Sequence, residues 1–188
     1  MIMLTWNVER SRATAGALEI ADQVAADVIF LQEASIGQSW HGPICSEQVQ
    51  GRAWGSAVLV RDGSLEPIAI HGYSGWVTGA CWRPKPTDVS ETIYLFSIHS
   101  PTANNDEPRG GYVAESLEIV LTRRHQGLPL PQTLRWNRAP ATPYHCDGFL
   151  LRGVDVASVQ CEVLSSGFVT RQSDHSPIVL WSRVARAG

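Results

Sequence analysis

Short apolar runs with alternating polar positions recur along the chain and predict a protein built mainly of strands. Residues 2–8 and 27–32 are predicted strands, and residues 14–26 between them carry alanine, leucine and valine at helical spacing. This order predicts a β-α-β unit at the start of the chain. Further strands are expected at residues 55–61, in one or two pieces within 65–83 that break at GYSG and TG, and at 93–99.

The remaining segments complete a strand-rich pattern with few helices. Residues 34–54 are rich in glycine, serine and tryptophan, and we expect a loop with a short helix there. Residues 112–126 carry apolar side chains on one face of a predicted second helix, whereas four prolines make residues 127–145 a loop. Strands are again expected at 146–151, 154–164 and 177–184. This pattern predicts packed sheets covered on the outside by helices.

Composition and charge are those of an ordinary soluble protein. The chain has 188 residues, of which 44% are hydrophobic and 18% charged, and we expect a single domain over residues 1–188. A net charge of -3 gives no overall positive field, so a polyanion would need a local basic patch. The arginines that could form one are Arg109, Arg123, Arg124, Arg135 and Arg138.

Cysteine spacing and the first residues bear on the cellular compartment. Cys45, Cys81, Cys146 and Cys161 form no CxxC pair and no zinc-like spacing, so we expect buried free thiols. The stretch MIMLTWNVER runs directly into a strand pattern without the features of a signal peptide. No apolar run approaches the roughly 18 residues of a membrane span. We expect a cytoplasmic protein, and no feature points to an obligate protein partner.

Polar residues follow or precede several predicted strands. Asn7, Glu33 and His99 stand at strand ends, and Asp174 and His175 come just before the last strand. A polar turn, a solvated carboxylate and a structural histidine are the simpler explanations. If the side chains converge on one rim, however, glutamate and asparagine supply oxygen ligands for Mg²⁺, which polarises phosphoryl oxygens. A nearby imidazole can exchange a proton near neutral pH.

The same stretches resemble the endonuclease/exonuclease/phosphatase family, to which DNase I belongs. The resemblance follows the family's order from end to end, and it rests on TWNV at 5–8, LQE at 31–33, IH ending at His99, an R…Q helix over 109–126, CDGFLL at 146–151 and SDHSPIV at 173–179. It implies an α/β fold, a four-layer α/β/β/α sandwich of two mainly antiparallel sheets. The resemblance also places the site at the rim between the sheets.

The resemblance implies a role for each site residue. Glu33 is similar to the family's metal-binding glutamate, with Mg²⁺ or Mn²⁺ as the cofactor, and Asn7 to the asparagine that holds metal and phosphate. His175 is similar to the catalytic histidine near the scissile phosphate, and Asp147 to the aspartate that orients it. Asp174 resembles a second polar contact to the phosphate region. His99 resembles a histidine that contacts substrate and assists the leaving group.

One motif of the family is missing from this chain. The family carries GDFN at the end of a central strand of the second sheet, with an aspartate for the attacking water, and we find no such segment. Pro129 and Pro131 make residues 128–132 a poor replacement strand. The second sheet could therefore lack one central strand. The chain could be a compact variant with Asp106 or Glu107 recruited, a pseudoenzyme, or an internally deleted form of an active enzyme.

These observations lead to a metal-dependent phosphoesterase as the predicted function. Its substrate is left open among nucleic acid, a phospholipid headgroup and a small phosphate ester. The alternative is a weakened pseudoenzyme that binds metal and phosphate or nucleic acid without efficient turnover. Other hydrolase and nucleotide-binding classes lack their signatures, because there is no Walker P-loop and no HExxH, and GYSGW is not a G-x-S-x-G elbow.

Overall fold

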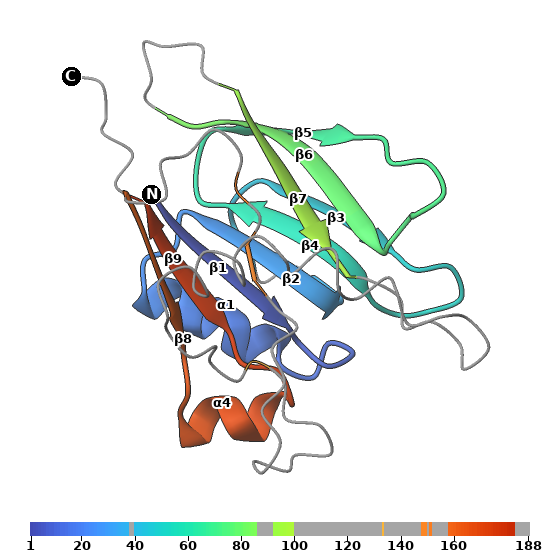
Figure 1. Cartoon of the computed structure of the whole chain (residues 1–188). Coiled ribbons are helices and arrows are strands. Elements are labelled where there is room, and N and C mark those ends of the chain that lie inside the picture. The colour runs from blue at the N-terminus through green and yellow to red at the C-terminus, as the bar shows by residue number, and fades with distance from the viewer. Residues whose placement is uncertain are drawn as a thin grey trace.

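The chain forms two β-sheets in the computed structural model, which describes residues 1–37, 40–85, 92–99, 133, 148–149, 151 and 158–182 (Figure 1). Within these residues, a six-stranded sheet has the order β3-β4-β2-β1-β9-β8, and a three-stranded sheet has the order β5-β6-β7. The strands are β1 (Ile2–Asn7), β2 (Val28–Ala34), β3 (Ile44–Gln48), β4 (Gly55–Val60), β5 (Ser64–Ile68), β6 (Val77–Arg83), β7 (Ile93–Ile98), β8 (Val159–Val163) and β9 (Ile178–Ser182). The β1–β2 pair is parallel and the other described pairs are antiparallel.

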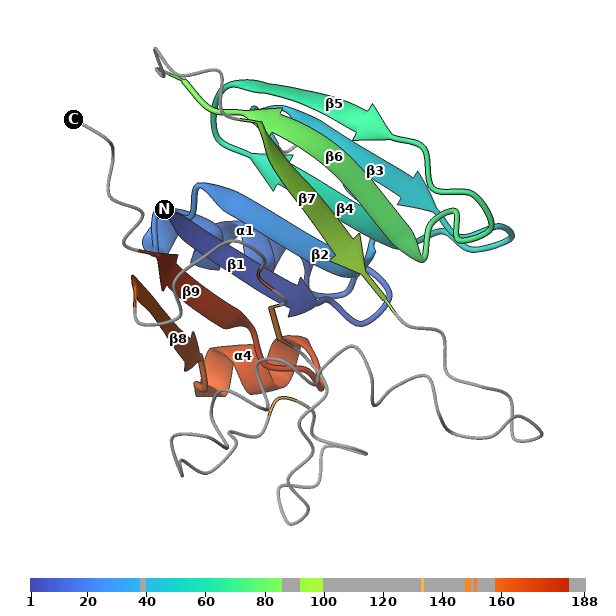
Figure 2. The same cartoon turned by 45° about the horizontal axis from the view of Figure 1, so that its top comes forward.

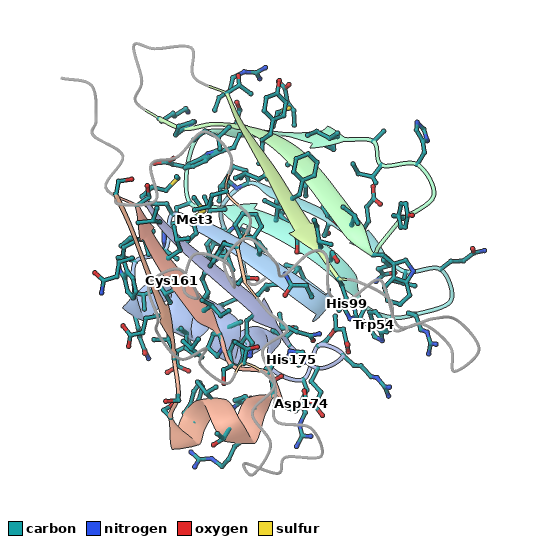
Figure 3. The ribbon with its side chains drawn as sticks, in the orientation of Figure 1. Met3, Trp54, His99, Cys161, Asp174 and His175 are labelled. Carbon is teal, nitrogen blue, oxygen red and sulfur yellow. The ribbon has the colours of Figure 1, made fainter. Side chains whose placement is uncertain are left out.

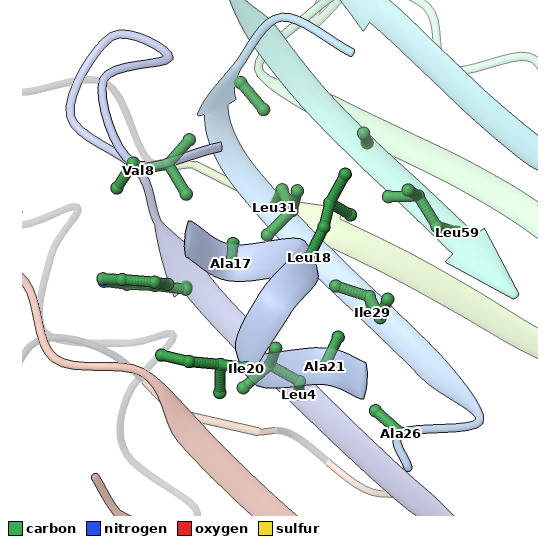
Figure 4. Packing of buried hydrophobic residues seen from close by; sticks show 14 of the residues in the cluster. Leu4, Val8, Ala17, Leu18, Ile20, Ala21, Ala26, Ile29, Leu31 and Leu59 are labelled. Atoms are coloured by element: carbon green, nitrogen blue, oxygen red, sulfur yellow. The ribbon is translucent and has the colours of Figure 1, made fainter. Parts of the chain in front are cut away.

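The predicted β-α-β opening is confirmed. Helix α1 (Thr14–Gln23) connects β1 to β2 and packs its small and aliphatic side chains on one face of the large sheet (Figure 4). Ala17 and Ala21 are fully buried and let the helix approach Leu4, Ile29 and Leu31 closely. The helix ends before the expected residue 26, since Ala25 adopts a left-handed backbone with φ 52°.

The opposite face of the large sheet packs against the three-stranded sheet (Figures 1 and 2). Alternation along β2 separates the two cores, because Val28 and Phe30 face the small sheet while Ile29 and Leu31 face α1. Trp82 and Leu95 contribute the facing side chains of the small sheet. These layers agree with the α/β sandwich expected from the sequence. The predicted helix over 112–126 and the region 100–132, where GDFN was sought, lie outside the described residues.

Two local predictions were wrong. Residues 44–48 form the edge strand β3, where a loop with a short helix was expected. Only Cys45 is buried in this polar strand, so the strand is held mainly by its backbone hydrogen bonds to β4. Such bonds do not depend on side-chain type, and the sequence therefore shows little hydrophobic pattern. Thr78 and Gly79 lie inside β6 and do not break it.

The last third of the chain contains a helix that was not expected there. Helix α4 (Gly167–Gln172) lies in a region predicted to be strand-rich. Its only clear sequence signal is Ser166, whose hydroxyl caps the helix by accepting a hydrogen bond from the Val169 N–H. Val169 packs into the same core as α1. The pieces of the predicted strands at 146–147, 150, 152–157 and 183–184 lie outside the described residues.

The described cysteines are free thiols, as predicted. Cys45 is buried, and this burial, reinforced by the charge of Glu47, raises the pKa of its thiol. Cys81 and Cys161 are half-buried, and Cys146 lies outside the described residues. Among the described residues, no helix is both long and apolar enough to cross a membrane.

Leu59→Ala tests the core beneath α1. Leu59 is fully buried and pairs with Ile29 across β2 and β4, so truncation leaves a cavity in the cluster that holds the helix. We expect the free energy of unfolding to fall by about 2–5 kcal/mol in urea denaturation. Tyr94→Ala is the control, because Tyr94 is 66% exposed and its removal should change stability by no more than about 0.5 kcal/mol. Equal losses in the two variants would contradict this assignment of the core.

Candidate active site at the rim between the sheets

Three side chains predicted from strand ends meet at one rim of the sandwich. Asn7 ends β1, Glu33 lies near the end of β2, and His99 directly follows β7 of the other sheet. The Asn7 side-chain amide donates a hydrogen bond to Glu33 Oε1 at 3.4 Å, and His99 Nε2 lies 3.5 Å from the same oxygen. Both sheets therefore contribute to one contact set around the Glu33 carboxylate.

A β-bulge directs Glu33 toward this rim. The pairing of β2 with β4 shifts register between Leu31 and Ala34, and Glu33 within the shift has a left-handed φ of 53°. Ala34, rather than Glu33, takes the next buried place on the face shared by Ile29 and Leu31. Left-handed backbone in a non-glycine residue costs about 1–3 kcal/mol and often accompanies functional sites. With regular alternation Glu33 would lie on the same face as Ile29 and Leu31, beneath α1. The bulge directs its carboxylate to the rim instead.

The loop after β1 binds Glu33 through its backbone. Glu9, Arg10 and Ser11 all have positive φ values, of 47°, 56° and 70°. In this conformation the Arg10 N–H donates to Glu33 Oε2 at 3.0 Å, and the Ser11 N–H donates to the Glu33 carbonyl oxygen at 2.6 Å. The Glu9 N–H donates to Asn7 Oδ1 at 3.1 Å. The loop therefore holds Glu33 through one hydrogen bond to its carboxylate and one to its backbone carbonyl, a role that sequence reasoning missed.

A buried glutamine joins the two sheets beneath the site. The Gln32 amide donates hydrogen bonds to Thr5 Oγ1 at 3.2 Å and to Ser97 Oγ at 3.1 Å. Ser97 in turn donates to the Leu31 carbonyl oxygen at 3.0 Å. Because Gln32 precedes Glu33 and Ser97 lies two residues before His99, this network sets the distance between the two site residues. The LQE resemblance predicts only Glu33 as a site residue, although a glutamine within an apolar strand is itself a signal of a buried polar contact.

The Asp174–His175 segment is tied to the end of β1. Ser173 Oγ donates to the Asn7 carbonyl oxygen at 2.8 Å and accepts a hydrogen bond from the His175 N–H at 3.1 Å. The Trp6 indole N–H donates to the His175 carbonyl oxygen at 2.9 Å. Figure 3 shows Asp174, His175 and His99 at the same end of the two sheets. Asp147, Asp106 and Glu107, which were also considered for the site, lie outside the described residues.

Glu33, His99 and His175 are partly buried, and each keeps a fraction of its side chain exposed to water. The exposed fractions of the side chains are 19% for Glu33, 15% for His99 and 16% for His175. Asp174 Oδ1 lies 3.9 Å from His175 Nε2, which is longer than a hydrogen bond. Partial burial strengthens charge interactions at the rim, while part of each side chain stays in contact with solvent.

The donor set of the rim fits a hard divalent cation. Within the described part of the chain, no three His, Cys, Asp or Glu side chains gather into a metal cluster. Mg²⁺, however, takes only one or two protein carboxylates and completes its shell with water and phosphate. Glu33 retains acceptor positions beyond its contacts with Asn7 and Arg10. A single carboxylate, with no thiolate beside it among the described residues, suits Mg²⁺ or Mn²⁺ better than Zn²⁺, whereas the Asn7 amide oxygen accepts a hydrogen bond from the Glu9 N–H.

Comparison with known families agrees with this geometry. A model of the Endonuclease/Exonuclease/phosphatase family matches residues 4–131, which is well over half of the chain. The chain belongs to this family. The matched residues include the Asn7, Glu33 and His99 positions that meet at the rim.

Solved structures share the fold of this family member at low sequence identity. The endonuclease domain of TRAS1, a telomere-specific non-LTR retrotransposon, is 15% identical with a TM-score of 0.62, covering 98% of this chain and 99% of that one. D. rerio TDP2 complexed with a single-strand DNA product is 12% identical with a TM-score of 0.50, covering 97% and 99%. A search of curated proteins finds no match.

Gln32→Ala tests the link between the sheets. The substitution removes two buried hydrogen bonds and side-chain volume, so we expect a loss of about 2–4 kcal/mol in the free energy of unfolding, measured in urea. Gln160→Ala on β8 is the matched control, because Gln160 is exposed and its truncation should cost less than about 0.5 kcal/mol. An unchanged unfolding midpoint for Gln32→Ala would show that the network contributes nothing.

Proposed function

We propose that this chain is a divalent-metal-dependent phosphoesterase. The observation that carries the proposal is the convergence of Asn7 and His99 on the Glu33 carboxylate at the rim between the sheets. Membership of a family of endonucleases, exonucleases and phosphatases supports the reaction class. One structural neighbour is an endonuclease domain and the other is complexed with a single-strand DNA product, which supports nucleic acid as the substrate over a phospholipid headgroup or a small ester.

Each residue has a distinct task in the proposed reaction. Glu33 holds Mg²⁺ or Mn²⁺, and Asn7 fixes the carboxylate and contacts phosphate. The bound cation would polarise the phosphoryl oxygens and offset negative charge. His175 exchanges a proton at the scissile phosphate, with Asp147 as its orienting partner, and Asp174 contacts the same region. His99, whose Nε2 lies 3.5 Å from Glu33 Oε1, assists the leaving group.

The second candidate function is binding without efficient turnover. The missing GDFN motif favours it, because the family's aspartate for the attacking water has no counterpart in this sequence. Loss of one member of a catalytic set can cost several orders of magnitude in rate. The rim residues would then bind metal and phosphate without hydrolysis.

The deciding experiment measures hydrolysis of bis-p-nitrophenyl phosphate and of a supercoiled plasmid with Mg²⁺, Mn²⁺ or EDTA. We expect metal-dependent turnover, lowered about 10²- to 10⁴-fold in Glu33→Gln and His175→Ala. Glu19→Gln on the exposed face of α1 should match the wild type, since it removes one carboxylate away from the rim.

Calorimetric titration with Mn²⁺ separates the two candidate functions. Under either of them, wild type should bind Mn²⁺ and Glu33→Gln should bind it far more weakly. Binding that depends on Glu33, combined with no hydrolysis, selects the pseudoenzyme. Metal-dependent hydrolysis that persists in both Glu33→Gln and His175→Ala would reject the assigned site.

A pair of aspartate substitutions tests the support of His175. Asp174 is partly exposed and 3.9 Å from the imidazole nitrogen, so water screens its charge. We therefore expect Asp147→Asn to lower kcat by about 10²- to 10⁴-fold and Asp174→Asn to lower it less. The measurement is kcat on the bis-p-nitrophenyl ester for both variants, with Mn²⁺ affinity as the control. A larger loss in Asp174→Asn would transfer the orienting role to Asp174.

A further inference from the structure

An aromatic cluster lies beside His99 that the proposed reaction does not use. Trp54 directly precedes β4, and Trp76 directly precedes β6. Their ring centroids lie 5.7 Å apart, and they lie 5.9 Å and 5.3 Å from the His99 ring. Figure 3 shows Trp54 next to His99 at the rim. The His99 ring therefore lies between the two tryptophans and the Glu33 carboxylate, which His99 contacts.

The cluster is held rigidly by hydrogen bonds between the sheets. Ser56 Oγ on β4 donates to the Trp76 carbonyl oxygen at 3.0 Å, and Thr78 Oγ1 donates to the Ser56 carbonyl oxygen at 2.8 Å. The two indole rings cross at 83°, so an edge packs on a face, and the His99 ring is tilted by 52° and 45° against them. A preformed aromatic surface loses little conformational entropy when a ligand stacks on it.

Two features of the cluster favour the binding of a ligand ring in addition to packing inside the protein. Trp54 and Trp76 are only half-buried, although an indole gains most by full burial. The exposed Arg52 places its guanidinium carbon 5.9 Å from the centre of the Trp54 ring. An indole face with a guanidinium beside it is the combination by which proteins bind bases and the adjoining backbone of single-stranded nucleic acid.

We propose that Trp54, Trp76 and Arg52 form a stacking surface for an unpaired nucleobase, on a nucleotide adjacent to the phosphate held at Glu33. The proposal rests on the proposed function, because Glu33 defines where that phosphate lies. The base must be unpaired, since bases within a duplex have their faces covered by their neighbours. The substrate class is thereby narrowed to single-stranded nucleic acid or an unpaired strand end.

The test measures the affinity of the full chain for short fluorescein-labelled DNA by anisotropy with Mn²⁺ present, and the DNA carries phosphorothioate linkages that resist cleavage. Three probes are compared: a single strand, the same strand made of abasic nucleotides, and a blunt duplex. We expect Trp54→Ala to weaken binding of the intact strand about 5- to 100-fold and to leave the abasic strand and the duplex unchanged. Trp54→Phe should retain most of the affinity because it keeps an aromatic face.

Matched controls separate stacking from charge and from folding. Arg52→Ala should weaken strand binding, whereas Arg83→Ala, which removes an exposed arginine at the opposite end of β6, should not. Tyr94→Ala removes an exposed aromatic ring near the far end of β7 and should also bind like the wild type. Unchanged Mn²⁺ affinity and unfolding midpoint in Trp54→Ala and Arg52→Ala show that the site and the fold are intact.

The outcomes distinguish this inference from the proposed function. Equal weakening of intact and abasic strands by Trp54→Ala would show that Trp54 acts only by holding His99, and it would overturn the stacking surface. Wild-type strand affinity in both Trp54→Ala and Arg52→Ala would also overturn it, even if the ester is hydrolysed. Strand binding that depends on Trp54 without any hydrolysis would support the stacking surface and remove the catalytic function.

Discussion

The buried amide of Gln32 is the interaction on which the geometry of the rim depends. Two sheets packed through apolar side chains alone could slide, because hydrophobic contact is not directional. Gln32 instead bonds Thr5 of its own sheet and Ser97 of the other. A buried amide without partners costs about 1–3 kcal/mol, so displacement of one sheet against the other is penalised. The register that brings His99 to within 3.5 Å of Glu33 follows from this constraint.

The strained backbone of the site is tolerated because that register is fixed. Glu9, Arg10, Ser11 and Glu33 all adopt left-handed conformations, each at a cost of about 1–3 kcal/mol. Hydrogen bonds from the Arg10 and Ser11 N–H groups to Glu33 offset part of this cost. The Glu33 carboxylate is therefore oriented before any ligand binds, so that binding does not carry the entropic cost of ordering this side chain.

Hydrophobic periodicity predicted those elements whose stability comes from burial. Strands β1, β2 and β4 and helix α1 bury apolar faces, and Asn7 and Glu33 followed from the ends of β1 and β2. His99 followed from β7, although that strand exposes its apolar Tyr94, Phe96 and Ile98. Edge strand β3 was missed because its ladder to β4 leaves no apolar pattern. The positive φ values of residues 9–11, the hydrogen-bond partners of Gln32 and the Trp54–Trp76–His99 cluster depend on segments far apart in the chain. A glutamine in an apolar strand marks Gln32 itself, but no local pattern encodes its partners.

Binding and turnover depend on different parts of this chain. The described rim combines a fixed carboxylate, an amide, two histidines and an aromatic cluster, which suit a cation, a phosphate and a base. Hydrolysis needs in addition a group that positions the attacking water, which is the task of the GDFN aspartate in this family. The acids considered for the site, Asp106, Glu107 and Asp147, lie in segments of the sequence separate from the rim residues Asn7, Glu33 and His99. A chain that lost the water-positioning group would lose rate by orders of magnitude yet keep the rim proposed to bind metal and phosphate. In the proposed scheme, binding requires Asn7, Glu33 and the tryptophans, whereas proton transfer requires the His175 imidazole in addition.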